Sequence, residues 1–375
     1  MKTKGALCWE VGKAWTLEEI DVGDPRTGEV QVRLAASGLC HSDEHFRNGD
    51  VPPKFLPVLG GHEGAGVITK VGPSVEGLAE GDHVVLGFVP SCGRCIPCAT
   101  GHQNLCDLGA GLMLGASISD GTYRVTVGGA PVLPLCLLGT FAPYVTCHAS
   151  AAIKIETDIP LDKAALLGCG VTTGWGSATI VADTRPGDTV VVVGIGGIGI
   201  NAVQGAAMAG AERVIAVDPV AFKREQAARF GATHAYTSMQ EALEPVRELT
   251  WGRMADSCIL TVGQIKGAHI AEALALVRKG GTAVVTALGD ATNVDVKLSL
   301  ADLTVMQKTL KGALFGGANP RADIHRLLHL YRDGQLKLDE LVTTTYRHDE
   351  VEQGYLDMAA GTNLRGMVVY GDADY

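Results

Sequence analysis

TVVVVGIGGIG, residues 189–199, is the stretch of sequence that decides the fold. It begins with Thr189–Val193, a run of β-branched residues without polar alternation, which is typical of a strand buried on both faces of a parallel sheet. Three glycines follow in the pattern G-x-G-x-x-G, and they are Gly194, Gly196 and Gly199. A buried strand that passes through a glycine-rich turn into a helical pattern predicts a βαβ unit.

The residues after this stretch repeat the alternation of strands and helices. Further strands are expected at 213–217, 256–261 and 282–287, and helices at 197–209, 221–230 and 265–277. Strands separated by such helices form a parallel, doubly wound sheet, because each connection must cross one face of the sheet. Residues 171–314 are therefore expected to form an α/β domain of the Rossmann type.

The chain before residue 171 has a different character. Short β-branched or alternating runs, bounded by glycine and proline, predict strands at 5–9, 29–36, 66–71 and 83–86. This pattern indicates an irregular, antiparallel, barrel-like domain. After residue 314 the α/β rhythm ends, and we expect a helix at 322–331 and a strand at 365–370 that could rejoin the first domain.

The glycine-rich turn predicts a dinucleotide site. Glycine lets the backbone approach a pyrophosphate, and Gly197 and Ile198 are further candidates for a cofactor contact where the helix begins. Asp218 ends the next strand, nineteen residues after Gly199, where a carboxylate accepts hydrogen bonds from ribose hydroxyls and repels a 2′-phosphate. The pattern therefore favours NAD over NADP. Lys223 is a second candidate for contact with the ribose; the alternative is that it is a solvated helix lysine. For the whole glycine pattern, the alternative is a turn that binds no ligand.

A second pattern is the run SCGRCIPCATGHQNLCD, which holds four cysteines with the spacing C-x2-C-x2-C-x7-C. They are Cys92, Cys95, Cys98 and Cys106. One short loop of this kind can place four thiolates around a single Zn²⁺ and leaves no open position, so the metal would be structural. Disulfides are disfavoured because nothing else indicates secretion, and the spacing lacks the proline-flanked fourth cysteine of bacterial iron–sulfur proteins.

The composition excludes several classes of function. The net charge of −10 over 375 residues argues against nucleic acid as a partner, because phosphate backbones need a basic surface. There is no run of about 18 apolar residues that would indicate a membrane span, and the N-terminal MKTKGALCWEVGKAW lacks the apolar core of a secretion signal. We therefore expect a cytoplasmic protein whose clustered cysteines bind metal.

Candidates for a second metal site come from three separate motifs. GLCHSDEH contains Cys40, GGHEGAG contains His62 and Glu63, and LGCGVTTGWG contains Cys169. A catalytic zinc needs about three protein ligands and one open position. The motifs are far apart, so spacing alone does not join them, and taken singly the cysteines would be core thiols and the histidine a turn residue.

Together these motifs resemble those of the zinc-dependent medium-chain alcohol dehydrogenases. The resemblance covers the whole chain and rests on GLCHSDEH, GGHEGAGVI, the four-cysteine loop, GCGVTTGWGSA, VVGIGGIG and the VD pair at 217–218. It implies a GroES-like, β-rich catalytic domain at 1–170, to which 315–375 returns, and a Rossmann domain at 171–314 that binds NAD(H). It also implies two zinc ions per subunit.

The resemblance assigns the metal ligands. Cys40, His62 and Cys169 would hold the catalytic ion, and the four-cysteine loop the structural one. Glu63 matches an acidic residue beside the ligand histidine that can approach the metal. Asp43 matches a residue that orients the histidine ring.

The same resemblance implies a route for a proton. Zinc lowers the pKa of a bound alcohol, and the proton passes to Ser42, through a ribose hydroxyl of the cofactor, to His45 and water. The hydride passes to the nicotinamide. Ser42 as a helix cap and His45 as an exposed helix residue are the alternatives.

Four further residues are assigned by position. Phe88 matches an aromatic wall of the substrate pocket, with plain core packing as the alternative, and Thr173 matches a nicotinamide contact. Arg365 matches an arginine that reaches the cofactor pyrophosphate. His41 stands where some members of the family carry another such arginine.

A closer resemblance is to the actinobacterial nicotinoprotein, or NDMA-dependent, alcohol dehydrogenases, carried by MKTKGALCWE, GIGINAVQGA, ALALVRKGG and LFGGANPRADI. In that group NAD(H) stays bound and is recycled by an external electron acceptor, for which N,N-dimethyl-4-nitrosoaniline (NDMA) is an artificial substitute. A homodimer or homotetramer acting on a small alcohol or aldehyde is implied. The alternatives are a dehydrogenase with freely exchanging NAD, one acting on S-hydroxymethyl thiol adducts, and a non-enzymatic NAD-binding zinc protein.

Overall fold

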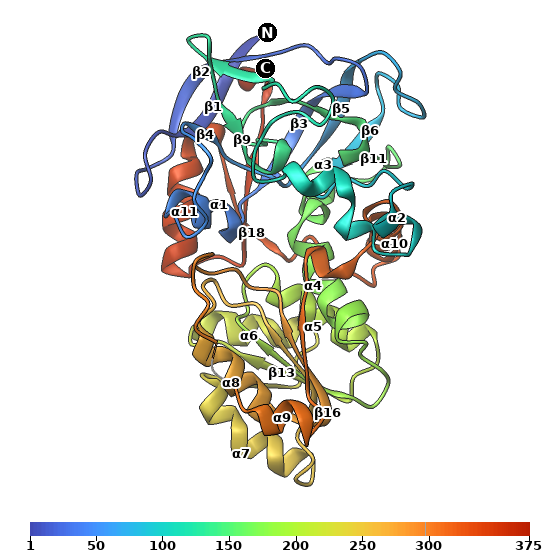
Figure 1. The fold of residues 1–375 in the computed structure, drawn as a ribbon, viewed down its shortest axis with the longest axis vertical. Coiled ribbons are helices and arrows are strands. Elements are labelled where there is room, and N and C mark those ends of the chain that lie inside the picture. Colours follow the sequence, from blue (N-terminus) through green and yellow to red (C-terminus); the bar gives the residue numbers. More distant parts are fainter. Residues whose placement is uncertain (297) are drawn as a thin grey trace. The chain divides into compact units, whose positions relative to one another are not determined.

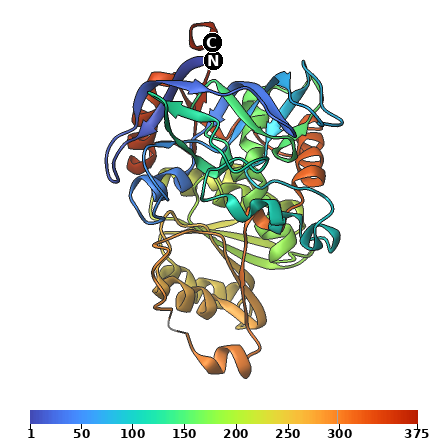
Figure 2. The ribbon, with the colours of Figure 1, turned by 45° about the horizontal axis from the view of Figure 1, so that its top comes forward.

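The computed structural model describes residues 1–296 and 298–375. These residues divide into two compact units, one made of 1–169 with 319–375 and the other of 170–318. Figure 1 and Figure 2 show the elements of both units from two directions. The C-terminal segment therefore belongs to the same unit as the N-terminal residues.

The unit 170–318 is built on a parallel sheet with the strand order β14-β13-β12-β15-β16-β17. The strands are His234–Tyr236 (β14), Arg213–Val217 (β13), Thr189–Val193 (β12), Ala255–Leu260 (β15), Val277–Val285 (β16) and Thr309–Gly312 (β17). Numbered along the chain, this is the order 3-2-1-4-5-6 of dinucleotide-binding sheets. The predicted parallel α/β domain is confirmed, and the order reverses between β12 and β15, where such sheets bind their ligands.

Helices cover both faces of this sheet. The helices of this unit are α4 (Gly170–Gly176), α5 (Gly199–Met208), α6 (Ala221–Arg229), α7 (Met239–Leu249), α8 (Gly267–Leu276) and α9 (Leu300–Thr304), and α5 to α8 contact the strands of the sheet. Val191 and Ile215 pack with residues of α7 and α8, and in Figure 1 these two helices lie on the side of the sheet opposite α5. All residues of β12 are buried for this reason.

The other unit contains two sheets in which most neighbouring strands are antiparallel. One has the order β8-β7-β2-β1-β4-β9, with Ala130–Pro131 (β8), Val125–Val127 (β7), Thr16–Val22 (β2), Lys2–Cys8 (β1), Val58–Leu59 (β4) and Leu133–Pro134 (β9). The second has the order β11-β6-β5-β3-β19-β18, with β10 also beside β3. Its strands are Ala152–Lys154 (β11), His83–Leu86 (β6), Gly64–Val71 (β5), Glu29–Gly38 (β3), Arg365–Val369 (β19), Val342–Tyr346 (β18) and Tyr144–His148 (β10).

The end of the chain completes this second sheet. β19 pairs antiparallel with β3, and Met367 lies opposite Gly38. The predicted return of the C-terminal strand is therefore confirmed. The pairing brings Arg365, the first residue of β19, to the end of β3 that leads into the motif with Cys40.

The remaining helices of this unit lie around the two sheets. They are α1 (His41–Arg47), α2 (Ile96–Ala99), α3 (Leu161–Ala164), α10 (Pro320–Arg332) and α11 (Val351–Ala360). Among the described residues, no single helix is long and apolar enough to cross a membrane, while one bent pair of helical segments, 161–168 with 170–181, passes that test by length and composition.

Some element ends differ from the sequence-based expectation. The helix expected at 197–209 begins at Gly199, because Gly197 and Ile198 belong to the glycine-rich turn. The helix expected at 265–277 ends one residue early, because Val277 opens β16. The sequence did not predict β14, β17 or α7. The two strands are short, and α7 contains Pro245 in its interior, which weakens the helical signal.

Candidate metal and dinucleotide sites

The three motifs of the expected catalytic site meet in one place. Cys40 precedes α1, His62 and Glu63 precede β5, and Cys169 ends the first segment, 1–169, of the unit to which all of them belong. The metal-binding atoms of these four side chains lie within 4.8 Å of one another, and all four residues are buried. Two thiols, an imidazole and a carboxylate at this distance are a donor set that suits zinc.

His62 is oriented by a buried carboxylate. Oδ1 of Asp43 accepts a hydrogen bond of 2.7 Å from the backbone N–H of Gly61 and lies 3.3 Å from Nδ1 of His62. Burial lowers the pKa of His62, but the negative charges of Asp43 and Cys40 outweigh this and raise the pKa well above its ordinary value. With Nδ1 directed to Asp43, Nε2 is the nitrogen that remains for a metal.

The two thiols of the cluster differ in acidity. A hydrogen bond from Cys169 lowers the pKa of Cys40 well below its ordinary value, against the effect of burial, and the charge of His62 adds to the lowering. The same hydrogen bond and burial raise the pKa of Cys169. The site therefore favours a thiolate at Cys40, and the thiolate is the form of cysteine that binds metal.

Glu63 is paired with Arg365. The guanidinium of Arg365 donates to the carboxylate of Glu63, and both side chains are buried. Burial raises the pKa of Glu63, and the charge of Arg365 opposes this. The sequence assigned Arg365 to the cofactor pyrophosphate, whereas the structure places it first of all against the acidic residue of the metal cluster.

The residues of the expected proton route lie on α1. Oγ of Ser42 is 3.6 Å from the Cys40 sulfur, and Ser42 is inside the helix rather than at its cap. His45 is buried, so the alternative of an exposed helix residue is wrong. Nδ1 of His45 lies 2.9 Å from the carboxylate of Asp50, and the ring of His41 meets the His45 ring edge to face. The sequence reasoning missed Asp50, although its position five residues after His45 was a local signal.

An apolar cluster borders the metal ligands. The ring of Phe88 meets the ring of His62 nearly at right angles, with centroids 5.7 Å apart. Phe88 also packs against a cluster of buried side chains formed by Phe46, Val58, Leu133, Leu135 and Cys136. Sequence patterns gave no sign of this cluster, because its members come from separate loops and strands.

The four cysteines of the loop form a second cluster, and their sulfurs lie within 4.8 Å of one another. The Cys92 and Cys98 sulfurs are 4.0 Å apart, and those of Cys95 and Cys106 are 3.8 Å apart. A disulfide needs a separation of about 2.05 Å, and all ten cysteines are free thiols. Backbone N–H groups of Arg94 and Cys95 point at the Cys92 sulfur. The disulfide alternative is therefore wrong for this loop.

The glycine-rich turn has the shape expected of a phosphate-binding loop. Gly194 has a φ of +89°, and its carbonyl accepts a hydrogen bond of 2.7 Å from the Thr261 hydroxyl. A Cβ at Gly199 would collide with the Gly194 carbonyl, whereas a Cβ at Gly196 would meet no atom within 4 Å. Gly196 therefore leaves open space beside the backbone, as a pyrophosphate requires.

The carboxylate of Asp218 stands at the same turn. Its two oxygens accept backbone hydrogen bonds from Ile195 (2.7 Å) and Val220 (2.9 Å), which fix the side chain beside the glycines. Arg224, a residue that the sequence reasoning missed, donates to the backbone carbonyl of Asp218 at 2.6 Å. Its neighbour Lys223, which was predicted to contact the ribose, is half-buried on α6.

Thr173 lies in α4, where it is buried. Its carbonyl accepts a hydrogen bond of 2.7 Å from the Ser177 hydroxyl. The assignment of Thr173 to the nicotinamide stays a prediction.

Comparison with known proteins gives matches along the whole chain. Residues 26–157 match the alcohol dehydrogenase GroES-like domain, and residues 197–333 match the zinc-binding dehydrogenase family. Alcohol dehydrogenase B of Mycobacterium tuberculosis is 52% identical over 374 residues, which is 100% of each chain. The NDMA-dependent alcohol dehydrogenase of Amycolatopsis methanolica is 51% identical over 370 residues, which is 99% of each chain.

A solved structure agrees with these matches. The alcohol dehydrogenase zinc-binding domain protein from Burkholderia ambifaria has a TM-score of 0.91 and 31% identity, with 99% of each chain covered. The sequence matches and this fold confirm the family resemblance. The chain therefore belongs to the zinc-dependent medium-chain alcohol dehydrogenases.

Proposed function

We propose that this chain oxidises alcohols to aldehydes, reversibly, with a catalytic zinc on Cys40, His62 and Cys169 and NAD(H) at the glycine-rich turn. The observation that carries the proposal is the buried cluster in which the ligand atoms of these residues and of Glu63 lie within 4.8 Å of one another. The four-cysteine loop would hold a second, structural zinc, because its four sulfurs leave no open position.

The residues present suit both groups. Bound zinc would supply Lewis acidity that lowers the pKa of the alcohol, and bound NAD would accept the hydride. Cys40, His62 and Cys169 offer three ligands, and Glu63 is held next to them by Arg365. Asp43 keeps the His62 ring in position.

Proton transfer falls to two side chains of α1. Oγ of Ser42, close to the ligand sulfur of Cys40, would accept the alcohol proton while it releases its own hydroxyl proton toward His45. Nδ1 of His45 is held by Asp50, so Nε2 is the nitrogen left to take up the proton that Ser42 releases. Phe88 and the apolar cluster behind it would pack against the carbon substituent of the alcohol and keep water away.

We further propose that NAD(H) stays bound during turnover and that an external electron acceptor recycles it. This proposal is supported by the closer sequence resemblance and by the 51% identity with a relative named NDMA-dependent alcohol dehydrogenase. A homodimer or homotetramer in the cytoplasm is proposed on the same resemblance, as are the contacts of Thr173, Lys223, His41 and Arg365 with the cofactor.

The test starts with the purified protein. Native mass spectrometry should find two zinc ions and one nicotinamide per subunit, and alcohol oxidation should proceed with NDMA and no added NAD. C169A should abolish turnover and lose one zinc. C98A should lose the other zinc and lower the stability of the protein before it lowers the activity. C147A is the matched control, since this buried thiol in β10 belongs to neither cluster.

Each alternative function predicts a different experimental result. Turnover only with added NAD would show that the cofactor exchanges. Oxidation of formaldehyde that requires glutathione or mycothiol would identify a thiol-adduct dehydrogenase. Normal turnover by C169A would contradict the proposed catalytic site.

A further inference from the structure

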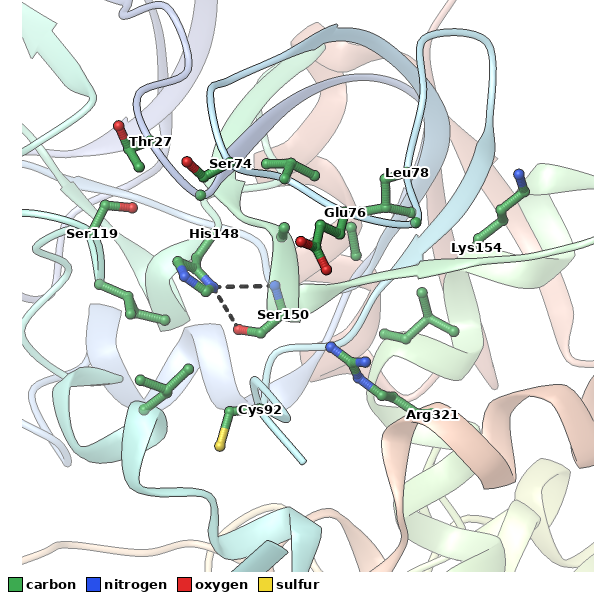
Figure 3. Close-up of a pocket in the computed structure, with 18 of the residues that line it drawn as sticks. Thr27, Ser74, Glu76, Leu78, Cys92, Ser119, His148, Ser150, Lys154 and Arg321 are labelled. Atoms are coloured by element: carbon green, nitrogen blue, oxygen red, sulfur yellow. Dashed lines mark hydrogen bonds between the residues drawn. The ribbon is translucent and has the colours of Figure 1, made fainter. Parts of the chain in front are cut away.

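A cavity of about 740 Å³ lies in the unit formed by 1–169 and 319–375 (Figure 3). Its walls come from the loop 74–78, the four-cysteine loop, the segment 118–119, the chain 148–154 and the start of α10. None of Cys40, His62 and Cys169 lines it. Its volume falls in the range of sites for small organic ligands.

Two unneutralised guanidinium groups line this cavity. Arg94 comes from the four-cysteine loop and Arg321 from the first turn of α10. Among the described residues, neither side chain takes part in an ion pair or hydrogen bond, whereas the third cation of the wall, Lys154, is paired with Asp82 at 2.7 Å. Glu76 is the acidic side chain among the lining residues. On a chain with a net charge of −10, this local excess of positive charge favours an anionic ligand.

His148 adds a neutral donor to the same wall. Its Nδ1 accepts a hydrogen bond of 3.1 Å from the backbone N–H of Ser150 and lies 2.8 Å from the Ser150 hydroxyl (Figure 3). Burial lowers the pKa of His148, against the charge of Glu29, and the charges of Arg94 and Arg321 lower it further. The neutral ring must then carry its proton on Nε2, because Nδ1 is the acceptor.

We propose that the cavity binds a small molecule through a phosphate monoester group. Such a group carries a charge of about −1.5 to −2 at pH 7, which two arginines without counter-ions match. The planar guanidinium suits phosphate oxygens. Nε2–H of His148 supplies a neutral donor for a remaining oxygen. Glu76 repels a second anionic group, so the rest of the ligand should be uncharged and carry hydroxyls. The proposal is independent of the proposed catalytic function.

Calorimetric titration of the full-length protein with glycerol 2-phosphate tests the proposal. NAD is kept saturating, so that the glycine-rich turn is not available to the phosphate. Wild type should bind in a saturable manner, and R321Q should bind at least about tenfold more weakly. R332Q is the matched control, because it removes the same charge from the other end of α10 outside the cavity. Its affinity should equal that of wild type.

Other results would overturn the proposal. These are the absence of saturable binding in the millimolar range, an equal loss of affinity in R321Q and R332Q, or binding of malonate as tight as that of the monoester. R94Q should also weaken binding, and it provides a second variant if R321Q loses zinc or changes the circular dichroism spectrum of the protein. Wild-type affinity in both R94Q and R321Q would place the ligand elsewhere.

Discussion

Arg365 forms a buried ion pair with Glu63, a residue 302 positions earlier in the chain. Glu63 stands next to the metal-ligand candidate His62, and Arg365 opens β19, the strand that returns from the C-terminal segment. The ion pair therefore joins β19, the last strand of the fold, to the residue beside the metal-ligand candidate His62. The guanidinium and the carboxyl are removed from water together, which is tolerated only while each has the other as a partner.

Removal of Arg365 should destabilise the protein strongly. R365M leaves Glu63 buried without a counter-charge, and breaking such a pair costs about 3–5 kcal/mol. Urea unfolding at saturating zinc measures the loss. The double variant E63Q/R365M carries no uncompensated charge, so it should be more stable than R365M alone. Equal stability of the two variants would contradict the buried charge as the cause.

Asp43 should control the zinc affinity of the catalytic cluster. D43N keeps an oxygen for the Gly61 N–H but removes the negative charge that orients His62, and such changes typically cost 10- to 100-fold in metal affinity. Competition with a chelator measures the effect, and the zinc of the four-cysteine loop serves as the internal reference. D50N is the matched control, because Asp50 binds His45 and not His62. Unchanged affinity in D43N would remove Asp43 from the site.

A buried ion pair outside both metal-ligand clusters should make stability depend on pH. Arg124 binds both carboxylate oxygens of Glu29, at 2.7 and 2.8 Å. Burial raises the pKa of Glu29, but hydrogen bonds from Arg124 and Ser117 outweigh this and lower it below 4.5. The pair therefore contributes its full stability above pH 4.5, and the contribution is lost as the pH falls through the lowered pKa.

The comparison of wild type with E29Q isolates this contribution. The difference in the free energy of unfolding between the two proteins should be largest at neutral pH and should shrink below pH 4.5. Zinc release in acid affects both proteins alike and cancels. A difference that stays constant between neutral and acidic pH would show that Glu29 keeps its ordinary pKa in the folded protein.

The features that the sequence predicted are those carried by local patterns. β12 and the glycine turn are contiguous, and the four cysteines lie within one loop, so spacing alone brought their side chains together. The position of Asp218 could be predicted because it directly follows β13, the first strand after the glycine-rich turn.

The pairs that the sequence did not predict join distant parts of the chain. Glu29 and Arg124 are 95 residues apart, and Glu63 and Arg365 are 302 apart, so no periodicity or spacing relates them. Cys40 and Cys169 could be joined only through the family resemblance. Tyr355, whose hydroxyl is 3.4 Å from the Cys40 carbonyl, was missed for the same reason.

Alanine at two glycines of the turn should have opposite consequences. A Cβ at Gly196 meets no protein atom, so G196A should leave the thermal stability within about 0.5 kcal/mol of wild type. It should nevertheless lower the amount of nicotinamide that co-purifies, because the methyl group fills the space that a pyrophosphate needs.

In G199A the main effect should be a loss of stability, and not a loss of nicotinamide from an otherwise stable protein. Its Cβ would collide with the carbonyl of Gly194, so the turn must shift at a cost of about 1–3 kcal/mol. Thermal unfolding of both variants, together with the nicotinamide released by acid, separates the two cases. Full nicotinamide content in G196A would mean that the cofactor does not approach this glycine, and the glycine-rich turn would then lose its assignment as the dinucleotide site.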